Sequence, residues 1–436
     1  MRAHPDHPSA TLAVAAWCAL IGTAIGVGVL YVHAHHTDLL VSAVPWFGHW
    51  ALQPKIARQL LLAAVVLGAG VCLLPVAAMR LPARVVFVVV GAASAIVAYR
   101  LALAGPHWTH WPSVQYDYGR YVGLVDRVGP ATFLRNYVRL QPTLPTHLSA
   151  HPPGFTLALW AAGRVGLEGS GFQLVVLLVA GAVCAVASLV IVRDVAGEAL
   201  MRAAAPFTVI APVAVWRTNP DVVFGAVALV GVALIVVASS RRGWRGVAYA
   251  VVGGLALATA LMTTYGVGLL VLPTVAVLWS RRAIVTGALA GAAIVAGLAV
   301  PLLWGFSWLA GLAATHRQYQ ASIAHQRGYL YWLLGNAAVF AVLLGPATFS
   351  AITRLRDPKL RLVVFAGLGC AVLAGLSGLS SGETERIWQP FAPLVLLAGA
   401  TLWFDGSRFD IRGARRWLAL QAIVALLFQA FLQSPW

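Results

Sequence analysis

Charge is scarce in this sequence. Only 13 of its 436 residues are Asp or Glu, and charged residues of both signs make up 10% of the chain. Soluble globular domains carry about 25% charged residues, so the shortage excludes an ordinary soluble protein. The hydrophobic share of 60% and the mean hydropathy of +0.84 instead indicate a protein that crosses the membrane several times.

Cysteine is also scarce. The four cysteines lie within apolar segments, at positions 18, 72, 184 and 370, and show no metal-ligand spacing. They are predicted to be small buried hydrophobic residues and carry no redox argument. His33, His35 and His36 raise the question of a metal, but no acid or cysteine completes a ligand set. No cofactor is therefore implied, and a divalent metal is not indicated.

Long apolar runs take up most of the chain. Thr11–Val32, Leu60–Ala78 and Val85–Leu103 are each long enough, at about 1.5 Å per residue, to cross a hydrocarbon core about 30 Å thick. Because these runs are continuous and do not alternate, they predict helices and exclude a barrel. About thirteen spans are predicted, at 11–32, 60–79, 85–104, 172–192, 204–216, 222–239, 246–263, 266–280, 284–303, 331–352, 362–379, 388–404 and 417–432.

The basic residues predict the orientation of these spans. The net charge is +17, but Arg and Lys are spread over alternate short gaps and form no single patch, which argues against nucleic acid as a partner. The basic gaps are predicted to be cytoplasmic, the first span a retained signal anchor, and the other gaps to face outside. The excess of arginine over lysine and the abundance of Ala, Val and Gly hint at a GC-rich bacterial source.

One outer gap is much longer than the others. Residues 105–153 are rich in Tyr, Trp, His and Arg, and the short apolar segment Phe155–Val165 that follows is predicted to be an interfacial or re-entrant helix. The single transmembrane domain (1–436) is accordingly divided into two additional N-terminal spans (1–84), an outer loop with interfacial helices that carries the chemistry (105–170) and the remaining spans (171–436).

Few acids are available for chemistry on the outer face. They are Asp38, Asp117, Asp126, Glu168, Asp221, Glu383 and Glu385. Asp117 lies among Tyr116, Tyr118 and Tyr121, where the membrane and aromatic neighbours would raise its basicity, so it is the candidate base. A helix cap or a salt bridge to Arg120 is the structural alternative. Asp221 heads a span, and capping of that helix is its alternative role.

Basic residues on the same face are candidate anion ligands. His151 opens the rigid turn His-Pro-Pro-Gly, which a helix start alone would also explain. Arg386 stands at the outer entrance of a late span, where a guanidinium suits a phosphate, although pairing with Glu383 or Glu385 is equally open. Further contacts to a phosphate or sugar, or a solvated face, would come from His316, Arg317, Tyr319, His325, Arg327 and Tyr329.

Taken in order, these motifs resemble the GT-C polyprenyl-phosphate-dependent membrane glycosyltransferases, especially the protein O-mannosyltransferase and lipid A aminoarabinose transferase type. That family places an acid and then a tyrosine in its first large outer loop, similar to Asp117 and Tyr121, and a basic residue before two prolines, similar to His151. A later acid that heads a span looks like Asp221. An arginine followed by spaced prolines looks like Arg386.

The resemblance covers about residues 85–400 and has three departures. The family often has two adjacent acids where this chain has Asp117-Tyr118, and a lysine where it has His151. A lysine-glycine pair common after a middle span appears here as Tyr265-Gly266. These departures concern the contacts to the donor phosphate and the identity of the sugar.

The resemblance implies an inverting transfer of one sugar from a polyprenyl-phosphate donor to a hydroxyl of a glycan, lipid or protein, on the extracytoplasmic face of a bacterial plasma membrane. Asp117 would be the base. Arg386, with Arg327 or His151, would bind the donor phosphate, and apolar grooves shared with membrane lipids would hold the prenyl chain. The implied substrate-binding residues are Tyr121, Asp221, Tyr265 and Glu385.

Two other classes of function remain open. A transporter or lipid-linked sugar flippase would place functional acids or broken helices at the membrane midplane, often in two related halves. The predicted spans contain almost no acids and no halves match. A scaffold without chemistry fits poorly with a long aromatic loop among short turns. The enzyme is therefore the favoured interpretation.

Overall fold

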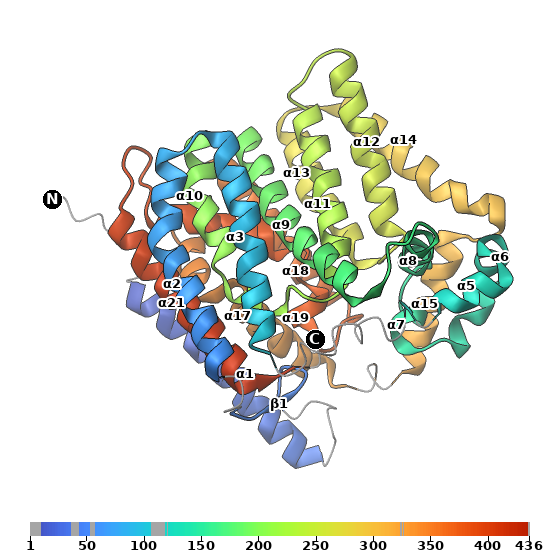
Figure 1. Cartoon of the computed structure of the whole chain (residues 1–436), viewed down its shortest axis with the longest axis horizontal. Helices are drawn as coiled ribbons and strands as arrows, with labels where there is room; N and C mark the ends of the chain where they lie inside the picture. Colours follow the sequence, from blue (N-terminus) through green and yellow to red (C-terminus); the bar gives the residue numbers. More distant parts are fainter. Residues whose placement is uncertain are drawn as a thin grey trace.

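The computed structural model describes residues 10–35, 43–52, 57–105, 118–119, 121–322, 325 and 327–434. These residues are mostly helical (Figure 1). They also hold one small sheet, in which β1 (His49–Trp50) pairs antiparallel with β2 (Leu432–Gln433), so the loop after the first helix is tied to the end of the last one.

Ten helices of the described chain are long and apolar enough to cross a membrane. They are α1 (Ala10–His35), α2 (Ala57–Arg80), α3 (Ala83–Leu103), α9 (Gly169–Ala196), α11 (Asp221–Ala238), α12 (Trp244–Leu261), α14 (Ile284–Ala299, continued by η6, Val300–Trp304), α17 (Tyr329–Ile352), α18 (Pro358–Leu376) and α21 (Ile411–Phe431). The prediction of an all-α polytopic membrane protein is confirmed.

Three further predicted spans consist of shorter pieces. The segment 204–216 contains the end of α10 (Glu198–Val209) and η4 (Pro212–Trp216), separated where Pro206 and Pro212 interrupt regular hydrogen bonding. The segment 266–280 contains η5 (Gly266–Leu270) and α13 (Val271–Ser280), and 388–404 contains α20 (Ala392–Leu396) and η7 (Leu397–Leu402). A count of thirteen spans therefore stays a prediction.

Close packing of α11 against α12 depends on glycine. A Cβ atom at Gly253 would lie 2.8 Å from the backbone oxygen of Gly231, and one at Gly231 would lie 2.9 Å from the oxygen of Gly253. Small residues allow two apolar helices to approach closely where no water is present to drive their association. This contact positions the start of α11 and the end of α12, which both border the candidate site.

The most buried long helix, α17, is broken within the bundle. Gly345 adopts a left-handed conformation with φ of 74°, and Pro346 follows it. The side chain of Gln421 in α21 fits the break, donating from Nε2 to the oxygen of Leu344 at 2.8 Å and accepting from the nitrogen of Ala347 at 3.4 Å. Backbone groups freed by the break are thus satisfied without water.

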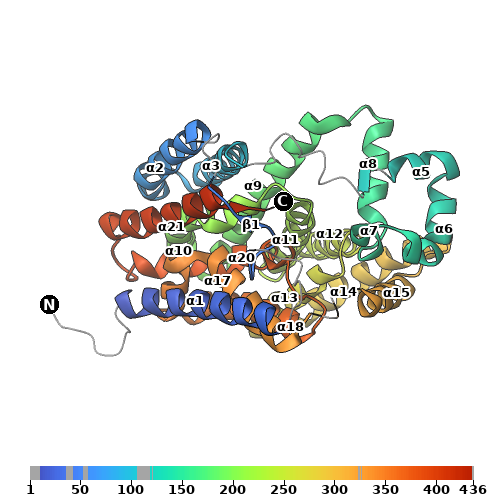
Figure 2. The same ribbon diagram turned by 90° about the horizontal axis from the view of Figure 1, so that it is seen from below.

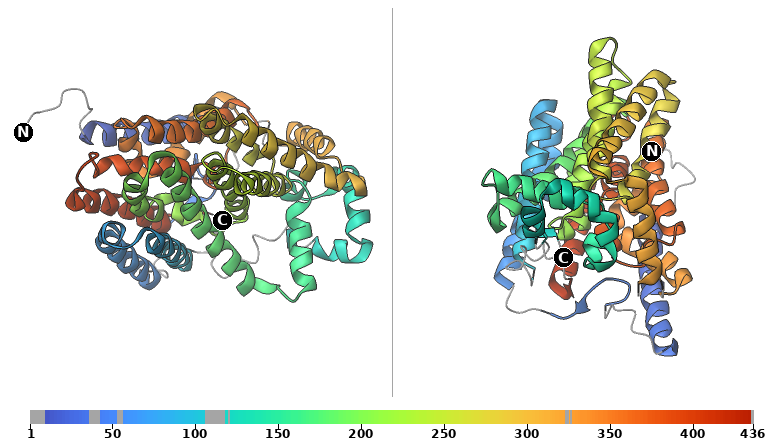
Figure 3. Two further views of the ribbon diagram at one scale, coloured as in Figure 1. Left: turned by 90° about the horizontal axis from the view of Figure 1, so that it is seen from above. Right: turned by 90° about the vertical axis from the view of Figure 1, so that its right-hand side faces the viewer.

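Short helices fill the connection between α3 and α9. They are α5 (Val122–Val128), α6 (Pro130–Leu140), η3 (Gln141–Thr143), α7 (Thr146–Ser149) and α8 (Gly154–Arg164). Figures 2 and 3 show this group at the side of the molecule away from α1 to α3. In α6, Phe133 and Tyr137 are buried against Phe306, just before α15 (Trp308–Ala321). The predicted helix at 155–165 is present as α8; its place at a membrane surface stays a prediction.

Candidate functional site

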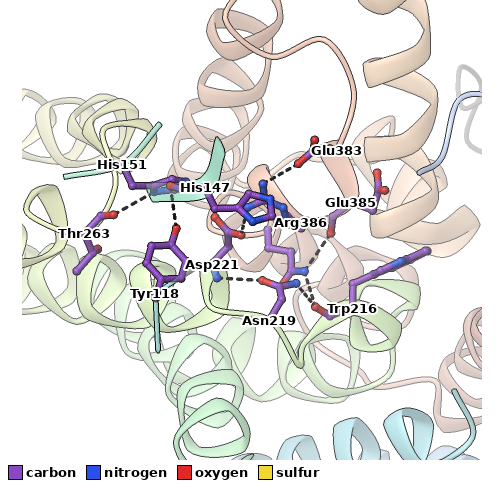
Figure 4. A network of polar contacts seen from close by, with 11 residues as sticks. Tyr118, His147, His151, Trp216, Asn219, Asp221, Thr263, Glu383, Glu385 and Arg386 are labelled. Atoms are coloured by element: carbon purple, nitrogen blue, oxygen red, sulfur yellow. Dashed lines mark hydrogen bonds and ion pairs between the residues drawn. The ribbon is translucent and has the colours of Figure 1, made fainter. Parts of the chain in front are cut away.

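Four segments that lie far apart in the sequence meet in one polar cluster (Figure 4). They are the turn between α7 and α8, the start of α11, the residues after α12, and the four-residue helix α19 (Thr384–Ile387). Long helices begin or end here, so their terminal backbone groups and side chains converge. The cluster contains both acidic and basic groups, most of them buried.

Arg386 is the centre of this cluster. Its Nη1 lies 2.6 Å from Oδ2 of Asp221, and its Nη2 lies 2.6 Å from Oε2 of Glu383. Arg386 and Asp221 are buried, and Glu383 is partly exposed. Burial would lower the pKa of Arg386, but the two carboxylates outweigh it and raise that pKa. One permanent cation therefore holds two acids from different elements.

Local hydrogen bonds hold Asp221 in place. The backbone nitrogen of Asp221 donates to Oδ1 of Asn219 at 2.9 Å, and Nδ2 of Asn219 donates to the oxygen of Trp216 at 2.6 Å. The same oxygen accepts from Nε2 of Gln389 at 2.5 Å. The turn that precedes α11 is thereby connected to the residues that follow α19.

The segment before Arg386 is strained and is held by one side chain of α17. Glu383 has a φ of 57°, which costs a residue with a Cβ atom about 1–2 kcal/mol. Asn336, fully buried in α17, donates from Nδ2 to the oxygen of Ser380 at 2.5 Å. Its Oδ1 accepts from the nitrogen of Gly382 at 3.3 Å and from Oγ1 of Thr384 at 2.8 Å. Strain held in this way is typical of functional sites.

Glu383 is held as a carboxylate. Burial acts to raise its pKa, but the charges of Arg386, His147 and Arg327 outweigh burial, and the pKa is lowered. Arg327 itself donates to the oxygen of Ser381 at 2.5 Å and lies 5.7 Å from the ring of Phe47 and 5.9 Å from that of Trp332. The predicted phosphate ligand Arg327 thus borders the segment that carries Arg386.

His151 is buried on the other side of the cluster. Its Nδ1 lies 3.1 Å from the backbone oxygen of Thr263, and its ring is 5.9 Å from that of Tyr118 and 5.7 Å from that of Phe224. Burial lowers the pKa of His151 to about 4, and the nearby carboxylate of Asp221 only partly opposes this. His151 is therefore uncharged at neutral pH.

The predicted base, Asp117, lies outside the described residues. The residue that follows it, Tyr118, is buried beside His151. Its ring makes a T-shaped contact with that of Phe155, with 5.1 Å between centroids, and its hydroxyl lies 3.5 Å from the oxygen of His147. The predicted substrate residue Tyr121 precedes α5 and packs against the main core.

Two other predicted substrate residues face different elements. Glu385 is fully buried and its Oε1 accepts from the nitrogen of Phe47 at 3.0 Å, in the loop between α1 and α2. Tyr265 packs against Trp308 of α15 with 5.2 Å between ring centroids, and burial raises its pKa. The structure thus joins His151, Asp221 and Arg386 in one cluster and directs Glu385 and Tyr265 elsewhere.

Sequence reasoning missed one polar residue of the site, Asn336, and gave Glu383 only as one of two possible partners of Arg386. Glu383 precedes Arg386 by three positions, a spacing at which opposite charges meet on a helix, and the structure shows this ion pair. Asn336 stands inside a predicted span, and a polar residue there signals hydrogen bonding to a neighbouring element. Within the described residues, no group of three or more His, Cys, Asp or Glu is placed to hold a metal ion.

Comparison of the chain with models of protein families, with curated proteins and with solved structures finds no match.

Proposed function

We propose that this protein is an inverting glycosyltransferase of GT-C type, which moves a sugar from a polyprenyl-phosphate donor to a hydroxyl on the extracytoplasmic face of a bacterial plasma membrane. One observation carries the proposal. His151, Asp221 and Arg386 come from three motifs of the resemblance and lie together in one buried cluster. A scaffold would have no need for charged and strained groups at the ends of membrane helices.

In the proposed reaction Asp117 accepts the proton of the acceptor hydroxyl as that oxygen attacks the anomeric carbon. The bond between the anomeric carbon and the phosphate oxygen breaks, and polyprenyl phosphate leaves with the bonding electrons. Attack from the face opposite to the phosphate inverts the anomeric centre. Tyr118, which follows Asp117 in the sequence, borders His151 and so supports a place for this step beside the cluster.

Arg386 has a double role in this proposal. A guanidinium carries five N–H groups, and two of its nitrogens already bond to Asp221 and Glu383. A phosphate that approaches Arg386 is also repelled by the negative charges of these two carboxylates. We therefore assign binding of the phosphate to Arg386 and Arg327 together, with Arg386 also pairing with Asp221 and Glu383.

The test uses purified protein in lipid nanodiscs with polyprenyl-phosphate hexose and pentose donors. Release of polyprenyl phosphate is measured, because it reports donor consumption whichever acceptor is used. Asp117→Asn is expected to lower release by at least about 100-fold, the usual share of general base catalysis. The matched control is Glu168→Gln, an exposed acid of the same region. Release by Asp117→Asn at the rate of this control would overturn the assignment of the base.

A flippase for lipid-linked sugars is the second candidate, favoured by the break in α17 at Gly345. It predicts donor transfer between leaflets without release of polyprenyl phosphate. Donor that is reconstituted in vesicles and becomes accessible on the opposite leaflet while its sugar stays attached would support this function against glycosyl transfer.

A further inference from the structure

The backbone around His151 is fixed by neighbouring elements. The hydroxyl of Tyr137 donates to the oxygen of His151 at 2.9 Å, and the nitrogen of His151 donates to the oxygen of Leu148 at 3.2 Å. Three residues later, the nitrogen of Gly154 donates to the oxygen of Met262 at 2.8 Å, and a Cβ atom at Gly154 would lie 2.3 Å from that oxygen. The close contact needs glycine and sets the His151 ring against the residues that follow α12.

The contact with Thr263 determines which ring nitrogen carries the proton. A backbone carbonyl oxygen only accepts hydrogen bonds, so Nδ1 of His151, 3.1 Å away, is the donor. A neutral imidazole has one N–H group, which leaves Nε2 as an acceptor with a lone pair. Within the described residues Nε2 has no hydrogen-bond partner.

The surroundings of the ring keep it neutral. Tyr118 and Phe224 pack against it, and burial holds its pKa well below the ordinary value. The titratable and charged groups that act on it are Asp221 on α11, Arg386 on α19 and His147 on α7. Asp221 favours the imidazolium, and the other two oppose it. Figure 4 shows the ring between Thr263 and the pair formed by Asp221 and Arg386.

We propose that His151 binds a substrate hydroxyl, with Nε2 as the acceptor, and that it does not serve as a cation for the donor phosphate. This inference rests on the proposed function and changes the role that the resemblance implies for the position. A hydroxyl of the donor sugar and the hydroxyl of the acceptor present the same chemistry to Nε2. The carbonyl of Thr263 is the group that holds the ring in this tautomer.

The decisive experiment is ¹⁵N NMR of histidine-labelled protein in nanodiscs, with His151→Asn used to assign the signals. At pH 7 we expect a protonated Nδ1 and an unprotonated Nε2. Polyprenyl phosphate alone should leave the Nε2 signal unchanged, whereas a polyprenyl-phosphate hexose or pentose, or octyl mannoside as acceptor alcohol, should shift it. A shift with the sugar donor assigns the hydroxyl to the sugar, and a shift with octyl mannoside assigns it to the acceptor.

An imidazolium at pH 7, a shift with polyprenyl phosphate equal to that with the sugar donor, or no shift with any of the three probes overturns the inference. The readout does not depend on turnover, so it decides the role of His151 even where no donor is consumed. Absence of donor consumption by the unaltered protein counts against the proposed function instead.

Two substitutions separate the roles of the ring. His151→Asn can keep a donor near the position of Nδ1 and lacks Nε2, whereas His151→Lys supplies a cation that would suit a phosphate. Both variants are expected to lower kcat/KM for donor consumption about 10-fold or more, the effect of losing about 1.4 kcal/mol from one hydrogen bond. Activity of His151→Lys at the level of the unaltered protein would identify the position as a phosphate ligand.

Discussion

Arg386 and Asp221 stand 165 residues apart in the sequence and form a buried ion pair, with 2.6 Å between Nη1 and Oδ2. The second terminal nitrogen of Arg386 holds Glu383 at the same distance. This cation therefore connects the start of α11 to α19 and pairs with a carboxylate from each. Removal of the Arg386 guanidinium would leave the buried Asp221 and the partly exposed Glu383 without their positive partner.

Arg386→Met is accordingly expected to destabilise the protein by about 3–5 kcal/mol, the usual effect of leaving a buried charge without its partner. Adding Asp221→Asn to this variant should restore part of the loss, because one of the two stranded charges is then removed. Thermal unfolding in detergent measures both effects. Arg317→Met, an exposed arginine of α15, is the control, and equal unfolding midpoints for Arg386→Met and this control would contradict the prediction.

The left-handed conformation of Glu383 predicts a difference between two small replacements. Glu383→Gly and Glu383→Ala both lose the contact with Arg386, but only alanine retains the backbone strain. We expect the glycine variant to be more stable by about 1 kcal/mol. Arg282, with a φ of 53° and away from the site, is the control, and its glycine variant should likewise be more stable than its alanine variant. If glycine were more stable than alanine at Arg282 but not at Glu383, the backbone of Glu383 would not carry this strain.

Asn336 is expected to position the segment that carries Arg386. Asn336→Leu leaves the oxygen of Ser380, the nitrogen of Gly382 and the hydroxyl of Thr384 without their partner, which costs about 1–3 kcal/mol for each group that water cannot reach. KM for the sugar donor should rise in Asn336→Leu. In Asn336→Asp, which keeps the accepting oxygen, KM should rise less.

The control for this variant is Asn136→Leu in α6, where the side chain of Asn136 makes an exposed hydrogen bond to the oxygen of Thr132. A lower unfolding temperature with an unchanged KM would show that Asn336 stabilises the fold without positioning the site.

His151 predicts loss of stability in mild acid. Its pKa is about 4 in the folded protein and 6.5 in its ordinary state, so the unfolded chain binds the proton first as the pH falls. The contribution of His151 to stability is complete above about pH 6.5 and is lost progressively as the pH falls toward 4. Over this range the loss amounts to about 3 kcal/mol at most.

Unfolding temperatures measured between pH 4 and pH 7 test this prediction. The difference between the unaltered protein and His151→Asn should grow smaller as the pH falls, because asparagine does not titrate. A constant difference across the range would show that His151 takes up no proton on unfolding.

The membrane architecture was predictable because it depends on local properties. A run of about 20 apolar residues needs a helix in a bilayer whatever surrounds it, and ten such helices appear within the described chain. The segments that proved shorter, such as 204–216 and 388–404, are those where prolines or 3-10 helices interrupt the α-helix. Both segments are apolar in sequence, so composition alone did not separate them from the long helices.

Site residues were predictable as types but not as partners. Asp221, His151 and Arg386 stood out because acids are few on the predicted outer face and because both basic residues precede prolines at a predicted helix start. Glu385 had the same signal as Glu383, two positions away, yet it turns toward Phe47 while Glu383 turns toward Arg386. Side chains two positions apart at a helix start point to different sides, and Asn336 from a different helix holds this segment in place.

The sequence by itself determined that the chain is a bundle of membrane helices with polar groups at their ends, because the hydrophobic effect acts on each run of residues where it stands. Tertiary structure decided that Arg386 pairs with Asp221 and Glu383 and that His151 is neutral with Nδ1 as its donor. Charge states and partners depend on distances of a few ångströms and on burial, and these exist only once distant segments have packed together.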